Sequence, residues 1–289
     1  MIIVTIPAYN EEKTLPFVLD DIKNGMKGYD YKVLVLNDGS KDKTAEIAKK
    51  LGAIVVSNRN NLGLAKTFQM EIQECIKLKA DIIVHTDADG QYYAKDIPRL
   101  VKEIEKGYDL VIGSRFKEGY PKHMPISKGI GNILFSKALT KLTKVPLTDT
   151  TTGFRAFTRD VAENIHFINS FTYTQEQLIK ASMQRYKIGE IAITTRKTRE
   201  SRLFKNPIEY AFKAWINILR IYRDYNPLGF FGKIGIYLIG LGFFFGLFLI
   251  YNVIKFGEIK HLPLALVTIL IILVGIQVIL FGFLADMKK

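Results

Sequence analysis

Cysteine is almost absent from this chain of 289 residues, and several familiar motifs are missing as well. The single thiol, Cys75, excludes a disulfide framework and a zinc cluster of cysteine and histidine ligands, and its helical context predicts a core residue. Neither a glycine-rich dinucleotide fingerprint nor a P-loop pattern occurs. The first apolar run, residues 2–6, ends at Pro7 and is too short for a signal peptide, so we expect a cytoplasmic N-terminal domain.

Two long apolar runs near the C-terminus indicate a membrane protein. Residues 234–254 and 262–284 carry no charged side chain. Each run is about 20 residues long, which is enough to cross a hydrocarbon core of about 30 Å. Two buried core helices are the alternative, but both runs are apolar on every side. The sequence therefore predicts a transmembrane hairpin over 227–289. The flanking Lys and Arg side chains favour both termini in the cytoplasm of a multi-pass cell-membrane protein.

Basic and apolar side chains alternate just before the hairpin. From Arg185 to Lys233 there are eleven Lys or Arg against four Asp or Glu, and the whole chain carries a net charge of +13. Residues 206–226 place Phe212 and Trp215 on one apolar stripe, which predicts an amphipathic helix in the bilayer interface. A helix packed on the catalytic domain is the alternative. No nucleic-acid recognition motif accompanies the charge, so we expect no nucleic-acid partner.

The first 115 residues alternate between strand and helix. Apolar, β-rich runs predict strands at residues 2–6, 31–36, 53–56, 82–86 and 110–113. Helical spacing of apolar residues lies between them, at residues 15–22, 42–51, 63–78 and 94–105. This alternation predicts an α/β fold with a mostly parallel, doubly wound sheet. Ligands of such sheets bind outside the carboxyl ends of the strands.

Polar side chains follow four of the predicted strands. The most informative group is Asp87-Ala88-Asp89-Gly90-Gln91, where two carboxylates and a carboxamide could bind Mg²⁺ or Mn²⁺ beside substrate phosphates. An ordinary acidic turn is the alternative. A calcium EF-hand is excluded, because Pro98 stands where its bidentate Glu belongs. The other polar strand ends are residues 7–11, 37–40 and 113–115, which predicts one shared pocket.

These motifs resemble those of family-2 glycosyltransferases with the GT-A fold, and more narrowly the polyprenyl-phosphate (dolichyl-phosphate) mannose and glucose synthases. The resemblance covers residues 1–205. It is carried by residues 6–12, Asn37-Asp38-Gly39-Ser40, the acidic turn, Gly113-Ser114-Arg115, Thr151-Thr152-Gly153-Phe154-Arg155 and residues 199–203. The order and spacing of the motifs match those of the family, and together they are specific.

The resemblance implies a role for each matched residue. The nucleoside of a sugar-nucleotide donor would be held by Pro7, Tyr9, Glu11, Leu36 and Asp38. Asp87 and Ala88 would lie against the donor ribose and phosphates. Asp89 and Gln91 would coordinate the Mg²⁺ or Mn²⁺ ion. Three cations, Arg115, Arg199 and Arg202, would face phosphates of the donor and acceptor.

The sequence departs from the family pattern at a few positions. Asn37 replaces the first Asp of the usual Asp-Asp-Gly-Ser, and Arg202 replaces a Lys, which keeps the charge but adds a planar fork. In the loop over residues 116–131, where relatives carry an Arg for the acceptor phosphate, the nearest cation is Lys128. Glu176 is open to three readings, as a general base, a ligand of sugar hydroxyls or a helix-surface residue, of which we favour a positioning role.

The expected activity is inverting transfer of a single hexose to polyprenyl or dolichyl phosphate at the cytoplasmic membrane face. Mannose from GDP-mannose is favoured, and glucose from UDP-glucose is the alternative. A transferase that extends a lipid-linked glycan is a second alternative, although processive relatives carry Gln-x-x-Arg-Trp and the only tryptophan here, Trp215, follows Ala214. A membrane scaffold with an inactive pocket is the non-enzymatic alternative. Relatives with paired spans also make a homo-oligomer conceivable.

Overall fold

A computed structural model describes residues 1–121, 124–167, 173–197, 226–257 and 262–287, together with eight positions of 212–224 (residues 212, 215–216, 219–220 and 222–224). The chain forms two compact units, Met1–Asn217 and Ile218–Lys289. The predicted amphipathic helix over 206–226 lies largely outside the described residues. Its boundaries therefore stay a prediction.

The first unit is built on one seven-stranded sheet with the order β3-β2-β1-β4-β6-β5-β7. The strands are β1 (Ile2–Ala8), β2 (Tyr31–Asn37), β3 (Ile54–Ser57), β4 (Ile82–His85), β5 (Leu110–Ser114), β6 (Arg155–Thr158) and β7 (Ile188–Ala192). Strand β6 runs antiparallel to both of its neighbours, and the other paired strands are parallel. The predicted mostly parallel α/β sheet is therefore confirmed.

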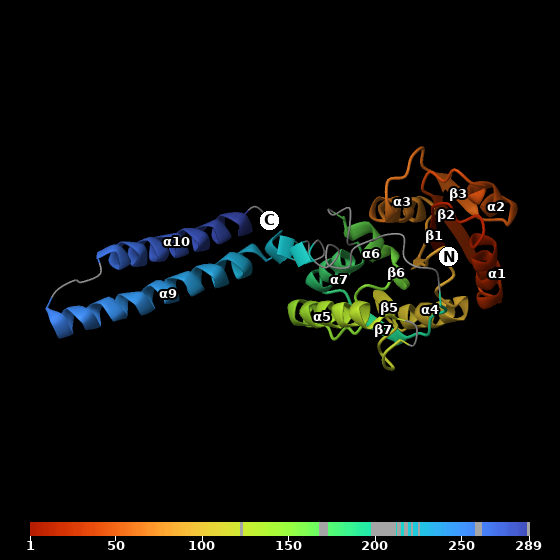
Figure 1. Ribbon diagram of the computed structural model, residues 1–289. Helices are drawn as coiled ribbons and strands as arrows, with labels where there is room; N and C mark the ends of the chain where they lie inside the picture. The colour runs from red at the N-terminus through yellow and green to blue at the C-terminus, as the bar shows by residue number, and fades with distance from the viewer. Residues whose placement is uncertain are drawn as a thin grey trace. The chain divides into compact units, whose positions relative to one another are not determined.

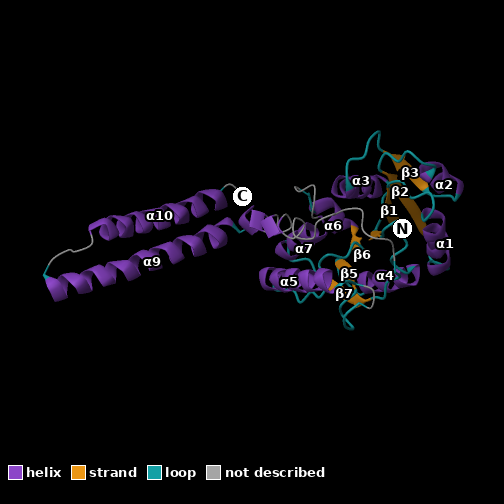
Figure 2. Ribbon diagram, in the orientation of Figure 1, coloured by secondary structure: helices purple, strands orange, loops and turns teal. Residues whose placement is uncertain are grey.

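Helices cover both faces of this sheet (Figures 1 and 2). They are α1 (Leu15–Gly25), α2 (Thr44–Lys50), α3 (Leu64–Lys77), the 3₁₀ turn η1 (Ala94–Asp96), α4 (Ile97–Glu105), α5 (Ile126–Thr143), α6 (Arg159–Asn164) and α7 (Tyr173–Met183). Helices α1, α2 and α4 share one core with the sheet. On the opposite face, α3 packs against α6 and α5 packs against α7.

The central strands are buried on both faces, which explains their nearly continuous apolar sequence. Val4 and Ile6 of β1 point into the core beneath α1, α2 and α4, together with Val84 of β4. On the other face of β1, Thr5 is also fully buried. Because the parallel strands end at the same edge, β1, β2, β4 and β5 deliver their polar ends to one side of the sheet.

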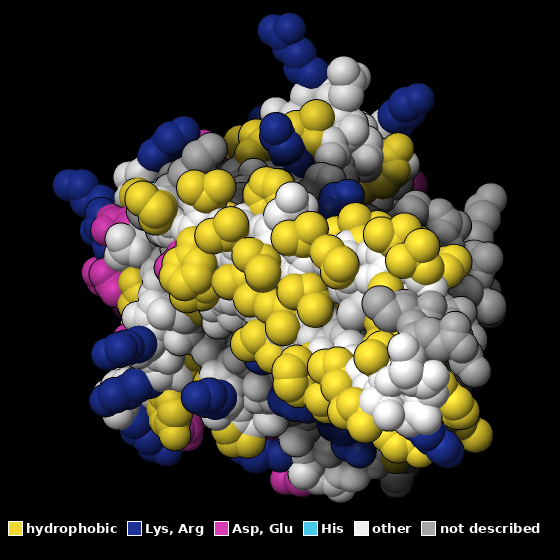
Figure 3. Space-filling view, turned by 90° about the vertical axis from the view of Figure 1, so that its left-hand side faces the viewer, with side chains coloured by type: hydrophobic (Ala, Val, Ile, Leu, Met, Phe, Trp, Pro, Cys, Tyr) yellow, Lys and Arg dark blue, Asp and Glu magenta, His cyan; other side chains and the backbone are white. Residues whose placement is uncertain are grey.

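Among its described residues from Pro227 onward, the second unit contains two long antiparallel helices, α9 (Pro227–Phe256) and α10 (Leu262–Asp286). Both are long and apolar enough to cross a membrane, so they could form a transmembrane hairpin. Asn226 caps α9, since its side chain accepts a 2.9 Å hydrogen bond from the Gly229 N–H. In Figure 3, hydrophobic side chains gather over these helices.

Glycines set the closeness of the two apolar helices. A Cβ on Gly235 would lie 2.6 Å from the Gly275 carbonyl oxygen, and one on Gly242 would lie 2.5 Å from Ile272 Cγ1. Real side chains do not tolerate such distances, so these positions require glycine for the observed packing. Small residues at helix contacts are typical of membrane-embedded pairs.

Candidate functional site

The acidic turn follows β4 at the carboxyl edge of the sheet. Asp89 accepts a 2.9 Å hydrogen bond at Oδ1 from the Gln91 N–H, which closes the turn. Gly90 has a φ of +74°, a conformation that side chains with a Cβ rarely adopt. Ala88 is buried, whereas Asp87, Asp89 and Gln91 are half-buried. The turn therefore presents its oxygen atoms at the surface while its backbone is fixed.

The two carboxylates of the turn repel each other. Loss of hydration, followed by the charge of Asp89, raises the pKa of Asp87 to about 6, and the charges of His85 and Arg115 oppose this rise. A divalent cation would relieve that repulsion, and hard oxygen donors suit Mg²⁺ or Mn²⁺. The described residues hold no group of three His, Cys, Asp or Glu side chains arranged for a metal. A cation here would be held by few protein ligands together with substrate phosphates, as is usual for Mg²⁺.

A buried polar network lies behind the turn. His85 is fully buried, and its Nδ1 lies 2.7 Å from Glu71 Oε2 of α3. Its Nε2 lies 3.2 Å from the Tyr173 hydroxyl and 4.0 Å from Asp87 Oδ1. The Thr5 hydroxyl donates to the same Glu71 oxygen at 3.1 Å. The network connects α3 and α7 to the turn.

Glu71 and Tyr173 were not expected at the site. A signal for Glu71 is present in the sequence, because this charged residue stands on the apolar face of α3, in helical spacing with Phe68, Ile72 and Cys75. All four side chains are buried, which also confirms Cys75 as a core residue. A carboxylate among core residues indicates a buried partner, but the sequence does not say which one.

The segment just before β6 packs directly against Asp87. A Cβ on Gly153 would lie 3.2 Å from both Asp87 carboxylate oxygens, so the glycine permits this close approach. The Gly153 N–H donates to the Tyr92 hydroxyl at 3.3 Å. Arg155 is fully buried, and its guanidinium donates to the carbonyls of Thr152, Gly153 and Thr174. This part of the Thr-Thr-Gly-Phe-Arg motif forms a rigid wall beside the turn.

Arg115 is held by an internal partner. Its Nε lies 2.6 Å from Asp149 Oδ2 and its Nη2 lies 3.0 Å from Asp149 Oδ1, and Nη2 also donates to the Thr151 hydroxyl. Burial alone would raise the pKa of Asp149, but the Arg115 charge and its hydrogen bonds hold that pKa below the usual range. The structure thus gives Arg115 a structural ion pair, and its predicted contact with a phosphate stays a prediction.

Arg196, which the sequence did not single out, fixes the turn to α1. Its guanidinium donates to the carbonyls of Gly90 and Tyr92 at 3.2 and 2.9 Å, and to Asp21 of α1 at 2.9 Å. The same guanidinium stacks over the Tyr93 ring, 3.9 Å from its centroid. Five donors in a planar fork allow one side chain to make all these contacts.

The expected nucleoside residues lie at the ends of β1 and β2. Tyr9 is 38% exposed and Pro7 is buried. Glu11 is also buried and accepts a 2.6 Å hydrogen bond from Thr14. Leu36 is fully buried, so its predicted contact with a nucleoside stays a prediction. Of these residues, Tyr9 offers the most exposed surface for stacking with a base.

Asp38 shapes the loop that follows β3. Its Oδ1 accepts hydrogen bonds from Asn58 Nδ2 and the Leu62 N–H, and its Oδ2 accepts one from the Gly63 N–H. Asn37, at the position where the family often has Asp, accepts from the Ser40 N–H and donates to Ser57. The carboxamide oxygen therefore closes the turn after β2, and the carboxamide nitrogen connects that turn to the end of β3. A nucleoside contact of Asp38 stays a prediction.

Several expected residues cannot be placed. Arg199 and Arg202 lie outside the described residues, and so does the side chain of Lys128. Glu176 of α7 is fully buried and pairs with Lys180 at 2.5 Å. This excludes a helix-surface position for Glu176 and is compatible with the favoured positioning role.

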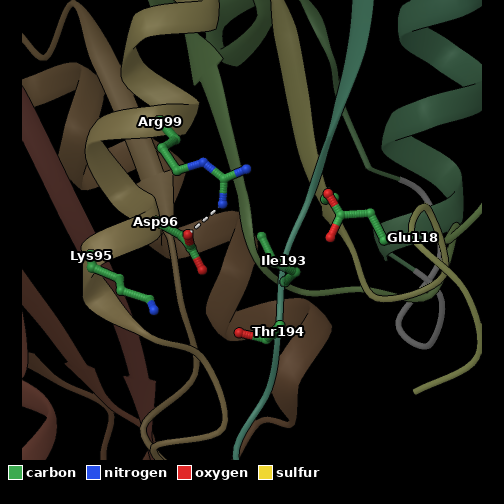
Figure 4. A pocket seen from close by; sticks show the side chains of 7 residues that line it. Lys95, Asp96, Arg99, Glu118, Ile193 and Thr194 are labelled. Carbon is green, nitrogen blue, oxygen red and sulfur yellow. Dashed lines mark hydrogen bonds and ion pairs between the residues drawn. The ribbon is translucent and has the colours of Figure 1, made fainter. Parts of the chain in front are cut away.

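A cavity of about 340 Å³ lies beside β7 and the start of α4 (Figure 4). It is lined by Lys95, Asp96, Arg99, Glu118, Ala192, Ile193 and Thr194. Arg99 turns toward Asp96 and bonds it at 2.6 Å, and the acidic and basic side chains balance in number. The cavity includes none of the expected donor residues, so we do not assign it to the donor.

The arrangement described so far defines a class of protein. The fold resembles that of glucosyl-3-phosphoglycerate synthase from Mycobacterium tuberculosis, solved with Mn²⁺, UDP-glucose and phosphoglyceric acid. The TM-score is 0.62 at 23% identity, covering 76% of this chain and 79% of that one. A sheet of this topology with an acidic turn after β4 defines a GT-A fold.

The family follows from the sequence comparison. Residues 3–166, more than half of the chain, match the model of Glycosyl transferase family 2, and the chain belongs to this family. The expected family and fold are therefore confirmed.

Curated relatives narrow the comparison. A dolichyl-phosphate hexose transferase of Haloferax volcanii is 34% identical over 67% of this chain and 82% of its own length. A UDP-N-acetylglucosamine–dolichyl-phosphate N-acetylglucosaminyltransferase of Methanococcus voltae is 30% identical over 76% and 96%. A dolichol-phosphate mannosyltransferase of Pyrococcus furiosus is 32% identical over 69% and 58%. The relatives share a lipid-phosphate acceptor in their names and differ in the sugar.

Proposed function

We propose that this glycosyltransferase transfers one hexose from a nucleotide sugar to a polyprenyl or dolichyl phosphate, inverting the anomeric centre. The observation that carries the proposal is the pair of carboxylates, Asp87 and Asp89, on a fixed turn at the carboxyl edge of the sheet. Mannose from GDP-mannose is the favoured donor, and the name of the relative from Pyrococcus furiosus, a dolichol-phosphate mannosyltransferase, supports mannose as the sugar. UDP-glucose is the main alternative donor. The name of the relative from Methanococcus voltae makes UDP-N-acetylglucosamine a third donor to test.

Asp89 and Gln91 would hold the divalent cation, Mg²⁺ or Mn²⁺, with Asp87 beside the nucleotide. When bound, the cation supplies Lewis-acid stabilisation of the pyrophosphate leaving group. Loss of hydration and the charge of Asp89 raise the pKa of Asp87, and a divalent cation beside the two carboxylates would offset their repulsion, which supports this assignment. The Mn²⁺ of the M. tuberculosis synthase is a further support.

The reaction of the acceptor requires little from the protein beyond orientation of the two substrates. A lipid phosphate is already anionic, so its oxygen can attack the anomeric carbon without a general base. Glu176 is paired with Lys180 inside α7, which supports a role in positioning rather than in proton abstraction. The rigid wall of Thr152 and Gly153 beside Asp87 would keep the donor in line for attack.

The apolar helices α9 and α10 would anchor the enzyme where its acceptor lies. We place them across the cell membrane, with the catalytic unit and both termini on the cytoplasmic side. This topology rests on the distribution of Lys and Arg around the two spans. Arg199 and Arg202 are the proposed phosphate ligands of the donor and acceptor, as bidentate partners.

A donor panel tests the proposal. The purified full-length chain is incubated with one polyprenyl phosphate and, in turn, GDP-mannose, UDP-glucose and UDP-N-acetylglucosamine, and the lipid product is analysed by mass spectrometry. We expect one donor to give a singly glycosylated lipid phosphate, and EDTA to abolish the reaction until Mg²⁺ or Mn²⁺ is restored. Transfer that persists unchanged in EDTA would contradict the metal assignment.

Asp89→Asn provides the matched variant. It should lower transfer by at least about a hundredfold, since it removes a charged metal ligand, and it should leave the circular dichroism spectrum unchanged. Products with several sugars would favour a transferase that extends lipid-linked glycans. An inactive wild-type chain with every donor would favour the membrane scaffold.

A further inference from the structure

Gly90 separates the two proposed metal ligands, Asp89 and Gln91, so its backbone conformation determines how their side chains are placed. Its φ of +74° belongs to the region that glycine adopts readily. Glycine also adopts the other allowed regions at little cost, so the residue type alone does not fix the turn. The observed conformation therefore depends on contacts that other parts of the chain make with the turn.

The segment that follows β7 holds the backbone of the turn. The Arg196 N–H donates to the Gln91 carbonyl at 2.9 Å, and Thr195 pairs with Tyr92 in an antiparallel bridge. The Arg196 guanidinium donates to the Gly90 carbonyl at 3.2 Å. The carbonyls of Gly90 and Gln91 are thus fixed by one residue, and the Gly90 contact requires the Arg196 side chain to stay in place.

Phe17 of α1 contacts both Gly90 and Arg196. A Cβ on Gly90 would lie 3.4 Å from Phe17 Cδ1 and Cε1, so the ring packs against the side of Gly90 where other residues carry a side chain. The Arg196 Cζ lies 4.8 Å from the centroid of the Phe17 ring and 3.9 Å from that of Tyr93. The Arg196 side chain is 23% exposed, and the attraction between a guanidinium and aromatic rings is stronger where water is partly excluded.

The core of α1 is complete without Phe17. The ring is 52% exposed. The residues of α1 that pack into the core are Leu15, Val18, Leu19 and Ile22. Exposed apolar side chains are common, so exposure by itself assigns no role to Phe17. Its contacts with Gly90 and Arg196 do assign one, because they meet at the residue whose conformation the turn depends on.

We propose that Phe17 is a positioning residue, which together with Arg196 holds Gly90 in its observed conformation. In that conformation Asp89 and Gln91 would bind the same cation. The proposal rests on the cation site proposed above. Phe17 would contact neither the cation nor the donor, so its removal should weaken binding of the cation more than it slows the transfer step.

Hydrogen exchange tests the positioning role without any ligand. Phe17→Ala removes the ring from Gly90 and Arg196, and we expect the backbone amides of residues 89–92 to exchange at least about fivefold faster in the full-length chain. Phe17→Tyr keeps the ring and should exchange like the wild type. Leu51→Ala is the matched control, because Leu51 is also 52% exposed but follows α2. Wild-type exchange at the turn in Phe17→Ala would overturn the proposal, and so would equally faster exchange throughout β1 and β4, which would indicate a general loss of stability.

Cation binding tests the consequence of the positioning role. Mn²⁺ is titrated into the full-length chain with GDP or UDP, and free Mn²⁺ is measured by electron paramagnetic resonance. We expect Phe17→Ala to weaken Mn²⁺ binding by about fivefold, Phe17→Tyr to restore it and Leu51→Ala to leave it unchanged. Wild-type affinity in Phe17→Ala would overturn the proposal. A wild-type chain that binds no Mn²⁺ would instead refute the proposed cation site, and the exchange experiment would still decide the role of Phe17.

A double-mutant cycle tests whether Phe17 acts through Arg196. The loss of Mn²⁺ affinity in F17A/R196K should be smaller than the product of the two single losses, because each substitution disrupts the same contact. Strictly multiplicative losses would overturn the shared action of the two residues. In transfer assays at saturating Mn²⁺, Phe17→Ala should keep kcat within about twofold of the wild type, and at limiting Mn²⁺ it should raise the KM for the donor. A lowered kcat with an unchanged KM would overturn the positioning role.

Discussion

Glu71 and His85 illustrate how the site depends on individual buried polar residues. Both side chains are almost fully shielded from water, and one Glu71 oxygen, Oε1, has no hydrogen-bond partner among the described residues. An unsatisfied buried oxygen is costly, so the fold tolerates it for the geometry that the rest of the network provides. That geometry is the placement of His85 4.0 Å from Asp87.

Glu71→Gln tests this network. The variant keeps the shape of the side chain but weakens the contact with His85, so we expect unfolding to cost about 1–3 kcal/mol less. We also expect a several-fold higher KM for the donor, because the support of Asp87 is loosened. Chemical denaturation and steady-state kinetics measure the two effects. Glu74→Gln on the same helix is the control, since its ion pair with Lys77 lies at the surface and is worth at most about 1 kcal/mol. Equal effects of the two substitutions on stability and on the donor KM would show that the buried contact contributes no more than the surface ion pair.

The ion pair of Arg115 and Asp149 predicts that the free energy of unfolding depends on pH in the acidic range. Since the pKa of Asp149 is lowered in the folded chain, its ionised form stabilises the fold at and above the ordinary aspartate pKa near 4, and this contribution disappears as the pH falls through the lowered value. We expect the free energy of unfolding to decline below about pH 4. Asp149→Asn should cost about 3–5 kcal/mol at neutral pH, because it leaves the Arg115 charge buried without a counter-ion.

The surface pair of Arg159 and Glu163 serves as the control for this prediction. Both side chains are about 40% exposed, so Glu163→Gln should cost less than about 1 kcal/mol. Denaturation curves at pH 7 and at a pH well below 4 would separate the two pairs, because the contribution of Asp149 is lost only in that lower range. A neutral-pH stability of Asp149→Asn equal to that of the wild type would contradict the structural role of the ion pair.

At the scale of elements, the acidic turn is held to α1 through the segment that follows β7. Arg196→Lys keeps the charge but cannot make the forked contacts with Gly90, Tyr92 and Asp21. We therefore expect a donor KM raised several-fold and a melting temperature lowered by a few degrees. Lys197→Ala, at an exposed neighbouring position, should leave both values near those of the wild type. A donor KM unchanged by Arg196→Lys would show that the acidic turn keeps its conformation without the forked contacts of Arg196.

The elements themselves were predictable to different degrees. The strands and helices of the first 115 residues follow from apolar periodicity, and the observed β1, β2, β4 and β5 begin and end close to the expected positions. Strand β6 has only four residues and runs antiparallel between two parallel strands. Its sequence, Arg155-Ala156-Phe157-Thr158, does not alternate strongly enough to mark it. Long-range pairing, rather than local pattern, creates this strand.

The residues of the candidate site were also predictable from the sequence only in part. Asp87, Asp89 and Gln91 were found because their spacing has a direct chemical meaning for a cation. Asp149, Tyr173 and Arg196 were missed, since each acts through a partner that is distant in the chain. Arg115 lies at the expected strand end, but only the structure reveals that Asp149 occupies its guanidinium.

At the scale of the whole molecule, the apolar helices should matter more for the acceptor than for the donor. A chain that ends before residue 228 lacks both of them. We expect such a chain to bind nucleotide sugar with near wild-type affinity and to lose most of its activity toward long-chain polyprenyl phosphate in membranes. Calorimetry and vesicle assays measure the two properties. Membrane association that survives the deletion would identify the segment before α9 as a sufficient anchor, whereas a loss of donor binding would show that the two units depend on each other.

The reversed direction of β6 has a consequence for how the enzyme can be divided. Residues 1–115 hold every motif expected to touch the nucleoside and the cation, yet β4 pairs with β6, which comes about 70 residues later in the chain. Cutting the chain after Arg115 would expose the edge of β4 and remove the Gly153 wall from Asp87. Donor recognition is thus not a module confined to the N-terminal half. Any attempt to transplant it between relatives must carry residues 149–158 along with the acidic turn.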